Sequence, residues 1–338
     1  MCSSCMMLFS IIRWRRPSGL QPFSLLANRY ASTRLTRREK IDNQNHLARS
    51  KLFQLDTQFN LFNKKVSRVV DLGYAPGNWM TYARDALSAT HDCEPEKIYQ
   101  KCTIVGLDIV VANAPQGTFA TQGNVLSKSA QRNVLEILKE HAYRNLAIKS
   151  GILNEKIGND ESKELTLEAG IEQTRALFET LSLSKDETLE SILSLQDYQA
   201  HLVMSDLTTP FLQNRGFFNN TFSRPFIRSS TNTALRMNLT DPEKNCIDLA
   251  DAALLFCCEN LAKAGSLVIR LAKVDLADPE LSLLRQRLEK LFTSVQKWSI
   301  ENKTESDIPK VQELFFICED KRDQIADKYI IFDVKRPS

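Results

Sequence analysis

A buried-strand segment that breaks into a glycine-containing turn limits the possible folds of this 338-residue chain more than any other feature. Residues 69–72 (VVDL) are typical of a strand, and residues 73–77 (GYAPG) form a turn before Trp79 opens a helix. Glycine lets backbone approach a ligand closely, and doubly wound sheets bind small molecules at the carboxyl ends of their strands. The spacing matches neither the G-x-G-x-x-G dinucleotide motif nor a phosphate-binding loop, which needs GKS or GKT. The turn therefore disfavours nicotinamide and flavin cofactors, while an ordinary Gly-Pro turn is the plainer interpretation.

Strands and helices alternate along the chain, which is typical of a parallel sheet covered by helices on both faces. We expect helices at 46–62, after Trp79, at 246–263 and at 278–292. The expected strands are 67–72, 103–109, 117–126, 201–207, 265–271 and 312–318, with 328–334 as a further edge strand. These elements predict a seven-stranded, mostly parallel α/β sheet.

The first 38 residues contain no acidic residue and combine seven arginines with apolar residues and serine. This composition predicts a mitochondrial transit peptide, cleaved near residues 29–32, although a basic RNA-binding arm is an alternative. The apolar run at 5–12 is too short to span a bilayer, so no membrane span is expected. Cys2 and Cys5 form a C-x-x-C without a second pair, so we expect neither a metal site nor a disulfide framework.

Residues 39–338 are left for one domain. Within it, residues 151–200 hold eleven acidic residues against four basic ones. We interpret about 150–200 as an acidic helical insertion outside the sheet. Like charges repel, so the insertion is not expected to bind RNA directly; it either contacts a basic protein or packs on the sheet.

Polar residues end three of the predicted strands. A carboxylate at Asp108 can accept hydrogen bonds from a ribose diol, and the amide of Asn124 can bond an adenine edge. Asp206 ends a third strand. Each alone is more often a solvent-facing strand end, but three beside the glycine turn favour a nucleoside-containing ligand.

Together these motifs resemble the FtsJ/RrmJ family of ribose 2′-O-methyltransferases, specifically its fungal mitochondrial large-subunit rRNA branch. The resemblance covers about residues 46–126 and 200–319. It implies a class I S-adenosylmethionine-dependent methyltransferase (Rossmann-like) fold, with S-adenosylmethionine as cofactor and no metal. It also implies a uridine in mitochondrial large-subunit rRNA, or in a pre-ribosomal subunit, as substrate in the mitochondrial matrix. The matching segments are 49–56 (RSKLFQLD), 71–79 (DLGYAPGNW), 204–207 (MSDL), 216–218 (GFF), 247–254 (IDLADAAL) and 312–316 (QELFF).

The resemblance also assigns cofactor contacts. The glycine turn would hold the methionine moiety, Asp108 the ribose and Asn124 the adenine, with Asp206 beside the sulfonium. The predicted cofactor-binding residues are Asp71, Gly73, Pro76, Gly77, Trp79, Asp108, Asn124 and Asp206.

The family carries a K-D-K-E set around the target ribose, and three members match here, as Lys51, Asp206 and Glu313. At the fourth position this chain has Arg270, which stays protonated and cannot act as a base. Either Arg270 stabilises a developing alkoxide while Asp206 or water takes the proton, or activity is lost and the protein is a cofactor-binding ribosome-assembly factor. Lys273 should face the opposite side of a regular strand, so it is not expected to substitute.

An arginine- and phenylalanine-rich segment, 215–236, is the predicted RNA contact, because arginine binds phosphate and aromatic rings stack on unpaired bases. A surface loop with buried phenylalanines is the alternative. Lys64, Lys65 and Arg68 would extend this basic surface. A small-molecule methyltransferase is a weaker possibility, which the three retained K-D-K-E positions oppose. The predicted RNA-binding residues are Arg215, Arg224, Arg228 and Arg236.

Overall fold

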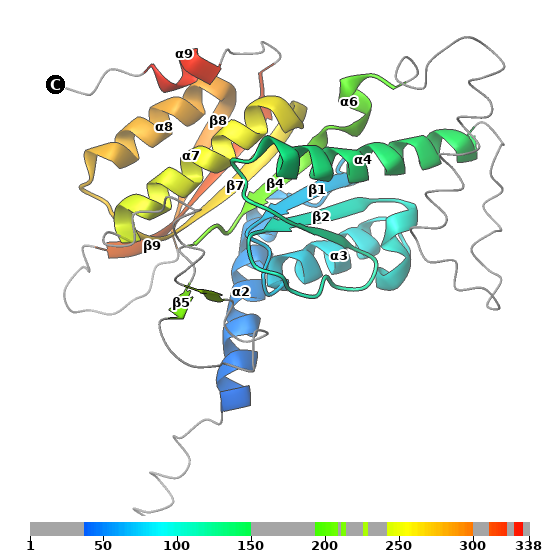
Figure 1. The fold of residues 1–338 in the computed structure, drawn as a ribbon, viewed down its shortest axis with the longest axis horizontal. Helices are drawn as coiled ribbons and strands as arrows, with labels where there is room; N and C mark the ends of the chain where they lie inside the picture. Colours follow the sequence, from blue (N-terminus) through cyan, green and yellow to red (C-terminus); the bar gives the residue numbers. More distant parts are fainter. Residues whose placement is uncertain are drawn as a thin grey trace, which may run out of the picture. The chain divides into compact units, whose positions relative to one another are not determined.

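The computed structural model describes residues 37–149, 193–208, 211–213, 226–228, 242–299, 311–322 and 328–333 (Figure 1). The chain divides into two units, Met1–His46 and Leu47–Ser338. In the first unit the described residues form the opening turns of helix α2 (Arg37–Phe59). The predicted transit peptide up to residue 36 and the acidic insertion from 150 to 192 lie outside the described residues.

The second unit is built on a seven-stranded sheet in the order β3-β2-β1-β4-β7-β9-β8. Only β9 runs antiparallel to its neighbours, which confirms the predicted seven-stranded, mostly parallel sheet. The strand order reverses between β1 and β4, the position where doubly wound sheets bind ligands. The strands are β1 (Arg68–Leu72), β2 (Thr103–Asp108), β3 (Phe119–Gln122), β4 (Ala200–Ser205), β7 (Leu261–Asp275), β8 (Phe292–Trp298) and β9 (Val311–Lys321).

Helices cover both faces of the sheet, because successive residues of a buried strand point to opposite sides. Val70 and Leu72 of β1 pack into one apolar cluster with α4, α7 and α8, whereas Val69 packs into another with α2 and α3 (Figure 1). The remaining elements are α3 (Asn78–Thr90), η1 (Pro95–Gln100), α4 (Lys128–Lys149), α6 (Leu195–Tyr198), α7 (Pro242–Asn260), α8 (Pro279–Leu291) and α9 (Lys328–Phe332), with the short strands β5 (Phe211–Gln213) and β6 (Phe226–Arg228).

The prediction of an edge strand at 328–334 is wrong, because this segment forms helix α9. Ile331 is fully buried, and Nζ of Lys290 on α8 donates to the backbone carbonyls of Ile330 and Asp333 at 2.7 and 2.9 Å. The seventh strand is instead β8, directly after α8. Its alternation is weak, since Gln296 and Lys297 are both exposed at the sheet edge.

The third strand is shorter than the predicted 117–126. Gly117, with φ +82°, forms a turn before the strand. After it, Oδ1 of Asn124 accepts a hydrogen bond from the backbone N–H of Leu126 at 3.0 Å, which starts a turn toward α4. Local turn chemistry at both ends therefore limits β3 to four residues.

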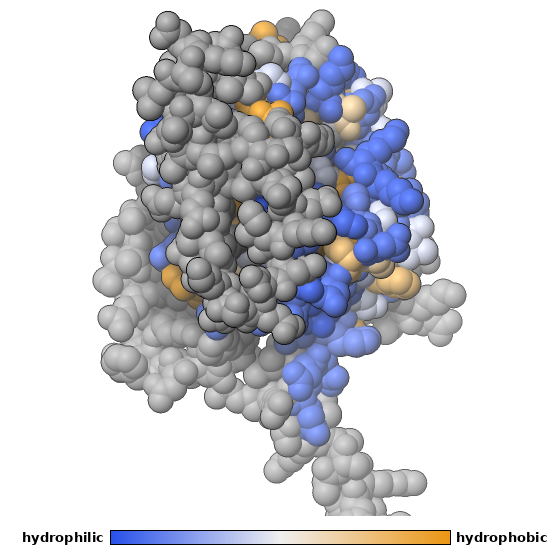
Figure 2. All heavy atoms as spheres, turned by 90° about the vertical axis from the view of Figure 1, so that its right-hand side faces the viewer, coloured by the Kyte–Doolittle hydropathy of each residue, from blue (hydrophilic) through white to orange (hydrophobic). Residues whose placement is uncertain are grey.

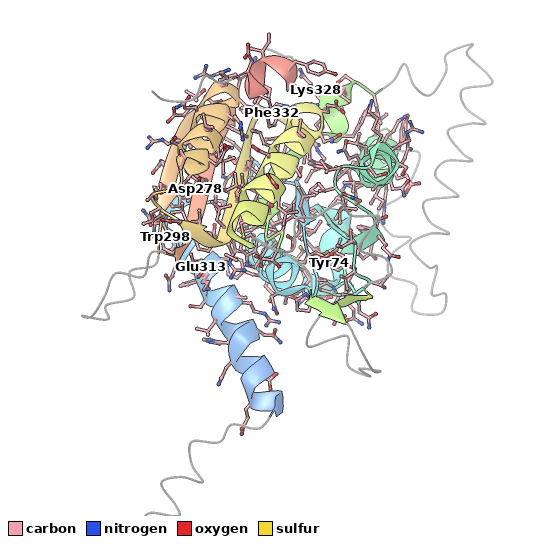
Figure 3. All side chains as sticks on the ribbon, turned by 60° about the vertical axis from the view of Figure 1, so that its left-hand side comes forward. Tyr74, Asp278, Trp298, Glu313, Lys328 and Phe332 are labelled. Atoms are coloured by element: carbon pink, nitrogen blue, oxygen red, sulfur yellow. The ribbon has the colours of Figure 1, made fainter. Side chains whose placement is uncertain are left out.

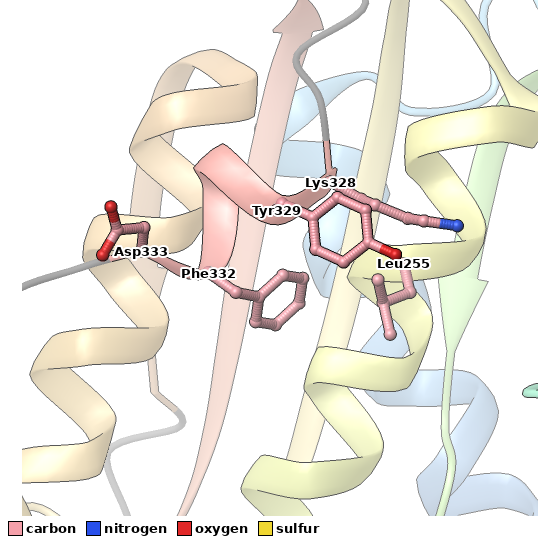
Figure 4. A pocket seen from close by; sticks show the side chains of 5 residues that line it. All are labelled: Leu255, Lys328, Tyr329, Phe332 and Asp333. Carbon is pink, nitrogen blue, oxygen red and sulfur yellow. The ribbon is translucent and has the colours of Figure 1, made fainter.

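Among the described helices, none is both long and apolar enough to cross a membrane. The face of the molecule in Figure 2 is mostly hydrophilic over its described residues. A hollow of about 560 Å³ borders α9, lined by Leu255, Lys328, Tyr329, Phe332 and Asp333 (Figure 4). None of the predicted site residues lines it.

Lys321 is a buried lysine that ties the end of β9 to the end of α7. Its Nζ donates to the backbone carbonyls of Cys257, Cys258 and Leu261 at 2.8, 2.9 and 2.6 Å. Only 8% of the residue is exposed, and burial lowers the pKa of its amine. The last carbonyls of a helix have no partner within the helix, so this amine satisfies groups that would otherwise be buried alone.

Replacing this amine should destabilise the protein. Lys321→Met keeps much of the side-chain length but leaves three acceptors unsatisfied, so we expect the free energy of unfolding to fall by about 3 kcal/mol. Urea unfolding followed by circular dichroism measures this. Lys290→Met removes two lysine–carbonyl bonds at a partly exposed position and should cost less than about 1 kcal/mol. Equal losses in the two variants would contradict a special role for Lys321.

Candidate active site

Asp71 at the end of β1 is the most unusual polar residue near the strand-order reversal. It is fully buried between Gly106 of β2 and Met204 of β4, with which it pairs. Neither carboxylate oxygen has a hydrogen-bond partner of ordinary geometry among the described residues, although the nearby backbone N–H of Met80 stabilises the charged form in part. Burial raises the pKa of Asp71 well above its usual range, and the nearby carboxylates of Asp206 and Asp108 add to the effect. A buried acceptor without a partner is costly, so the site is prepared for a donor or cation from outside.

The glycine turn after β1 lies tightly against the neighbouring strand ends. Gly73 has φ +83°, and a Cβ there would lie 3.0 Å from backbone atoms of Asp206 and Leu207. Its N–H donates to the carbonyl of Leu107, while the N–H of Asp206 donates to that of Leu72. Gly77, with φ +106°, is the N-cap of α3. Both glycines adopt a conformation that side chains rarely allow.

Tyr74 and Asp108 hold this turn in shape. The Tyr74 hydroxyl donates to the carbonyl of Ala112 at 2.7 Å. The Asp108 carboxylate accepts hydrogen bonds from the backbone N–H groups of Ala75 and Val110, both at 3.0 Å. Asp108 therefore organises backbone already, and only its remaining lone pairs are available to a ribose.

Sequence reasoning missed Tyr74 and its partner Gly106. A Cβ at Gly106 would lie 2.6 Å from the Tyr74 ring and 2.7 Å from Sδ of Met80. The available signal was a glycine inside an otherwise apolar strand, which often marks a close approach.

Three predicted cofactor contacts differ in their surroundings. Trp79 is a core residue, 3% exposed and stacked on Phe315 with ring centroids 6.5 Å apart. Its ring therefore packs beneath the turn, and its contact with the methionine moiety stays a prediction. Pro76 is exposed on the turn. Asn124 uses its amide oxygen locally, for the N–H of Leu126.

The four K-D-K-E positions form one ion-pair network. Nζ of Lys51 on α2 donates to Oε1 and Oε2 of Glu313 at 2.8 and 2.6 Å. Nε of Arg270 donates to Oε1 of Glu313, and its Nη1 donates to Oδ1 of Asp206, both at 2.5 Å. Each of the four side chains keeps 22–23% of its surface accessible. The network is therefore held in place and still within reach of a substrate.

The network sets the protonation of its members. Although burial alone would lower the pKa of Arg270, the carboxylates of Asp206 and Glu313 raise it above its usual value. Burial alone would raise the pKa of Glu313, but Arg270 and Lys51 hold it below its usual range. In Asp206 burial outweighs Arg270, and the pKa is raised. Asp206 is therefore the better proton acceptor of the two carboxylates.

A bulge in β7 removes the reason for placing Lys273 on the face opposite Arg270. Between Leu271 and Val274 strand β7 contains a bulge, because three residue steps on β7 pair with two on β9. An extra residue reverses the alternation of side chains, so counting i+3 no longer assigns a face. The Lys273 side chain itself lies outside the described residues.

A family comparison identifies the chain. The model of the family described as FtsJ-like methyltransferase matches residues 48–321. This chain belongs to the FtsJ-like methyltransferase family. It is similar to the mitochondrial rRNA methyltransferase 2 of Saccharomyces cerevisiae, with 27% identity over 277 residues, 80% of each chain. It is also similar to the large-subunit rRNA methyltransferase E of Zymomonas mobilis, with 30% identity over 41% of this chain and 52% of that protein. The mitochondrial rRNA methyltransferase 2 of Schizosaccharomyces pombe is 26% identical over 30% of this chain and 42% of that protein.

Like its family, this FtsJ-like methyltransferase has the Rossmann-like class I fold and uses S-adenosylmethionine. The residues at the strand-order reversal fit that cofactor. Its sulfonium and amino groups are cationic, and Asp71, Asp108 and Asp206 bring three carboxylates together at neighbouring strand ends. Arg270 neutralises Asp206, whereas no cation pairs with Asp71 among the described residues.

The predicted RNA contacts of this methyltransferase fall mostly in segments outside the described residues. Arg215, Arg224 and Arg236 lie outside the described residues, as does the side chain of Arg228 in β6. Arg68 is described, and its placement corrects the prediction.

Arg68 begins β1 at the amino edge of the sheet, opposite the site. Its guanidinium donates to the carbonyls of Gln199 and Gln196 at 2.6 and 3.1 Å and contacts Nε2 of His201 at 2.6 Å. Lys64 and Lys65 precede β1 at the same edge. Arg68 therefore joins β1 to the start of β4 and does not extend a basic surface beside the site.

Asp71 should make the free enzyme less stable as pH rises. Its raised pKa lets the folded state keep a proton that the unfolded chain releases near pH 4, so stability falls from there up to the folded-state pKa. Asp71→Asn mimics the protonated form. We expect the variant to match the wild type near pH 4 and to exceed it by about 2 kcal/mol at neutral pH without cofactor.

Urea unfolding midpoints across this pH range measure the difference. Asp85→Asn, at an exposed position on α3, is the control and should leave the pH profile unchanged. A neutral-pH midpoint for Asp71→Asn below that of the wild type would contradict the interpretation.

Proposed function

We propose that this methyltransferase transfers a methyl group to the ribose 2′-oxygen of a uridine in mitochondrial large-subunit rRNA, and thereby supports ribosome assembly. The observation that carries the proposal is the accessible ion-pair network of Lys51, Glu313, Arg270 and Asp206 next to the cofactor strand ends. The similar proteins named as rRNA methyltransferases support rRNA as the substrate class. The acid-free arginine-rich start of the chain and the two relatives named as mitochondrial support the matrix as the compartment.

The cofactor residues have distinct roles in this proposal. Gly73 and Gly77 let the backbone reach the cofactor, with Pro76 on the outer side of the turn. Asp71, buried beneath the turn, contributes negative charge near its cationic groups, and Asp108 and Asn124 bind the nucleoside. Bound S-adenosylmethionine supplies an electrophilic methyl group, so holding the acceptor oxygen in line contributes much of the acceleration.

The network residues act on the ribose. Asp206 or a water molecule takes the proton of the 2′-hydroxyl, since Asp206 has the raised pKa. Arg270 stays protonated and stabilises the negative charge that develops on the oxygen. Lys51 and Glu313 position the sugar. Around this centre, Arg215, Arg224, Arg228 and Arg236 contact RNA phosphates.

A second function is favoured by Arg270 itself. Arginine cannot become neutral and act as a base, and here it is engaged with two carboxylates at once. If that engagement prevents proton transfer, the protein is a cofactor-binding assembly factor without methyl transfer.

Mapping ribose methylation in mitochondrial large-subunit rRNA tests the proposal. Deleting the gene should remove one 2′-O-methyl group from a uridine, and the wild-type gene should restore it. Asp206→Ala should not restore it, because the proton acceptor is lost, whereas Asp85→Ala at an exposed position should. An unchanged methylation map together with impaired subunit assembly would favour the assembly-factor function.

The role of Arg270 has its own test. Arg270→Met keeps an unbranched side chain without charge and should lower kcat about 100-fold, with little change in affinity for S-adenosylmethionine. Arg270→Lys keeps a positive charge and should retain activity. Single-turnover methylation of large subunits from the deletion strain gives both values. An inactive wild type with an active Arg270→Lys would show that the arginine itself silences the site.

A further inference from the structure

Trp298 is the last residue of β8, and strand pairing places it in one row with the site. Trp298 pairs with Phe315 of β9, and Phe315 pairs with Arg270 of β7. Residues paired across neighbouring strands point to the same face of a sheet. Because β9 is antiparallel to both β7 and β8, β8 runs in the same direction as β7 and ends at the carboxyl edge. Trp298 therefore lies on the face and at the edge of the sheet that carry Arg270.

The indole of Trp298 is supported from one side and partly open. Its ring meets the Phe315 ring edge-on, with centroids 5.4 Å apart and an interplanar angle of 65°. Phe315 is fully buried and stacked on Trp79. Trp298 is only half-buried, and β8 is the outermost strand of the described sheet. An aromatic ring held this way presents a contact surface with little further loss of conformational entropy on binding.

Strand pairing also gives the spacing between Trp298 and the ion-pair network. Glu313 precedes Phe315 by two residues, so it lies on the same face and diagonally opposite Trp298 (Figure 3). Arg270 is two strand spacings from Trp298, roughly 10 Å. A base resting on the indole would therefore place its ribose beside Arg270 and Glu313. The cations Lys51 and Arg270 stand where the sugar and its phosphates would come.

We propose that Trp298 is the stacking platform for the base of the nucleotide whose ribose is methylated, which must be unpaired. The inference rests on the proposed function and adds the residue that orients the acceptor. Stacking on an aromatic ring accepts any base, so Trp298 supplies affinity and orientation, while base identity is read elsewhere. A paired base cannot reach the platform, because both its faces are covered by its neighbours in the helix.

Two substitutions separate stacking from packing. Trp298→Phe keeps an aromatic face, and Trp298→Leu keeps apolar contact with Phe315 but has no ring. With large subunits from the deletion strain as substrate, Trp298→Leu should raise KM for RNA about tenfold, and Trp298→Phe should stay within about twofold of the wild type. KM for S-adenosylmethionine should not change in either variant. Tyr329→Leu, at an exposed aromatic residue of α9, is the matched control and should leave both values unchanged.

Equal KM values for the leucine and phenylalanine variants would overturn the proposal, because the indole would then serve only to cover Phe315. A direct binding measurement keeps this result separate from a failure of the proposed function. Binding of single-stranded oligouridylate to the full chain without cofactor should weaken about tenfold in Trp298→Leu but not in Trp298→Phe. Equal affinity in all three proteins would overturn the platform whether or not the wild type methylates rRNA. Absence of methylation with an intact affinity difference would overturn only the enzymatic function.

Discussion

The site depends on how closely the backbone after β1 approaches the backbone after β4. The N–H of Gly73 bonds to β2, the N–H of Asp206 bonds back to β1, and no room remains for a side chain at position 73. This contact joins three strands at their ends and sets the spacing of Asp71, Asp108 and Asp206. Carboxylates held so near one another repel, and the fold tolerates the repulsion by pairing Asp206 with Arg270 and by raising the pKa of Asp71. We expect a cationic cofactor bound beside these carboxylates to reduce their repulsion.

The ion-pair network balances two positive and two negative side chains, and Arg270 is its centre. A guanidinium can serve two carboxylates in different directions, which one ammonium group does less well. Arg270 therefore fixes the positions of the Asp206 and Glu313 carboxylates. Unlike a lysine at this position, it cannot exchange a proton with the substrate. Asp206 is the group that can accept a proton instead, because burial raises its pKa even though Arg270 lies beside it.

Strands at the centre of the sheet were predictable from the sequence. The predicted strands at 67–72, 103–109 and 201–207 differ from β1, β2 and β4 by no more than two residues at either end, because a strand buried on both faces is a continuous apolar run. The elements at the β8 edge of the sheet were not predictable in the same way. The β8 sequence alternates weakly, and the apolar residues of α9 read as a strand, since only packing against α8 decides their conformation.

The site residues likewise divide into those that the sequence could predict and those that it could not. Strand-end carboxylates could be found because they follow apolar runs, and the ion-pair partners because they fit a family pattern. The burial of Trp79, the position of Arg68 at the far edge and the bulge in β7 depend on pairing between distant segments. One sequence contains no direct record of such pairing.

Strand β9 runs opposite to the other strands of the described sheet. Every other strand of the described sheet, β8 included, ends at the edge that carries the site, whereas β9 begins there. Trp298 and Val311 therefore both lie at the edge of the sheet that carries the ion-pair network. A change of chain length between these two residues leaves every strand pair of the described sheet intact, so we expect the protein to tolerate it at little cost to stability.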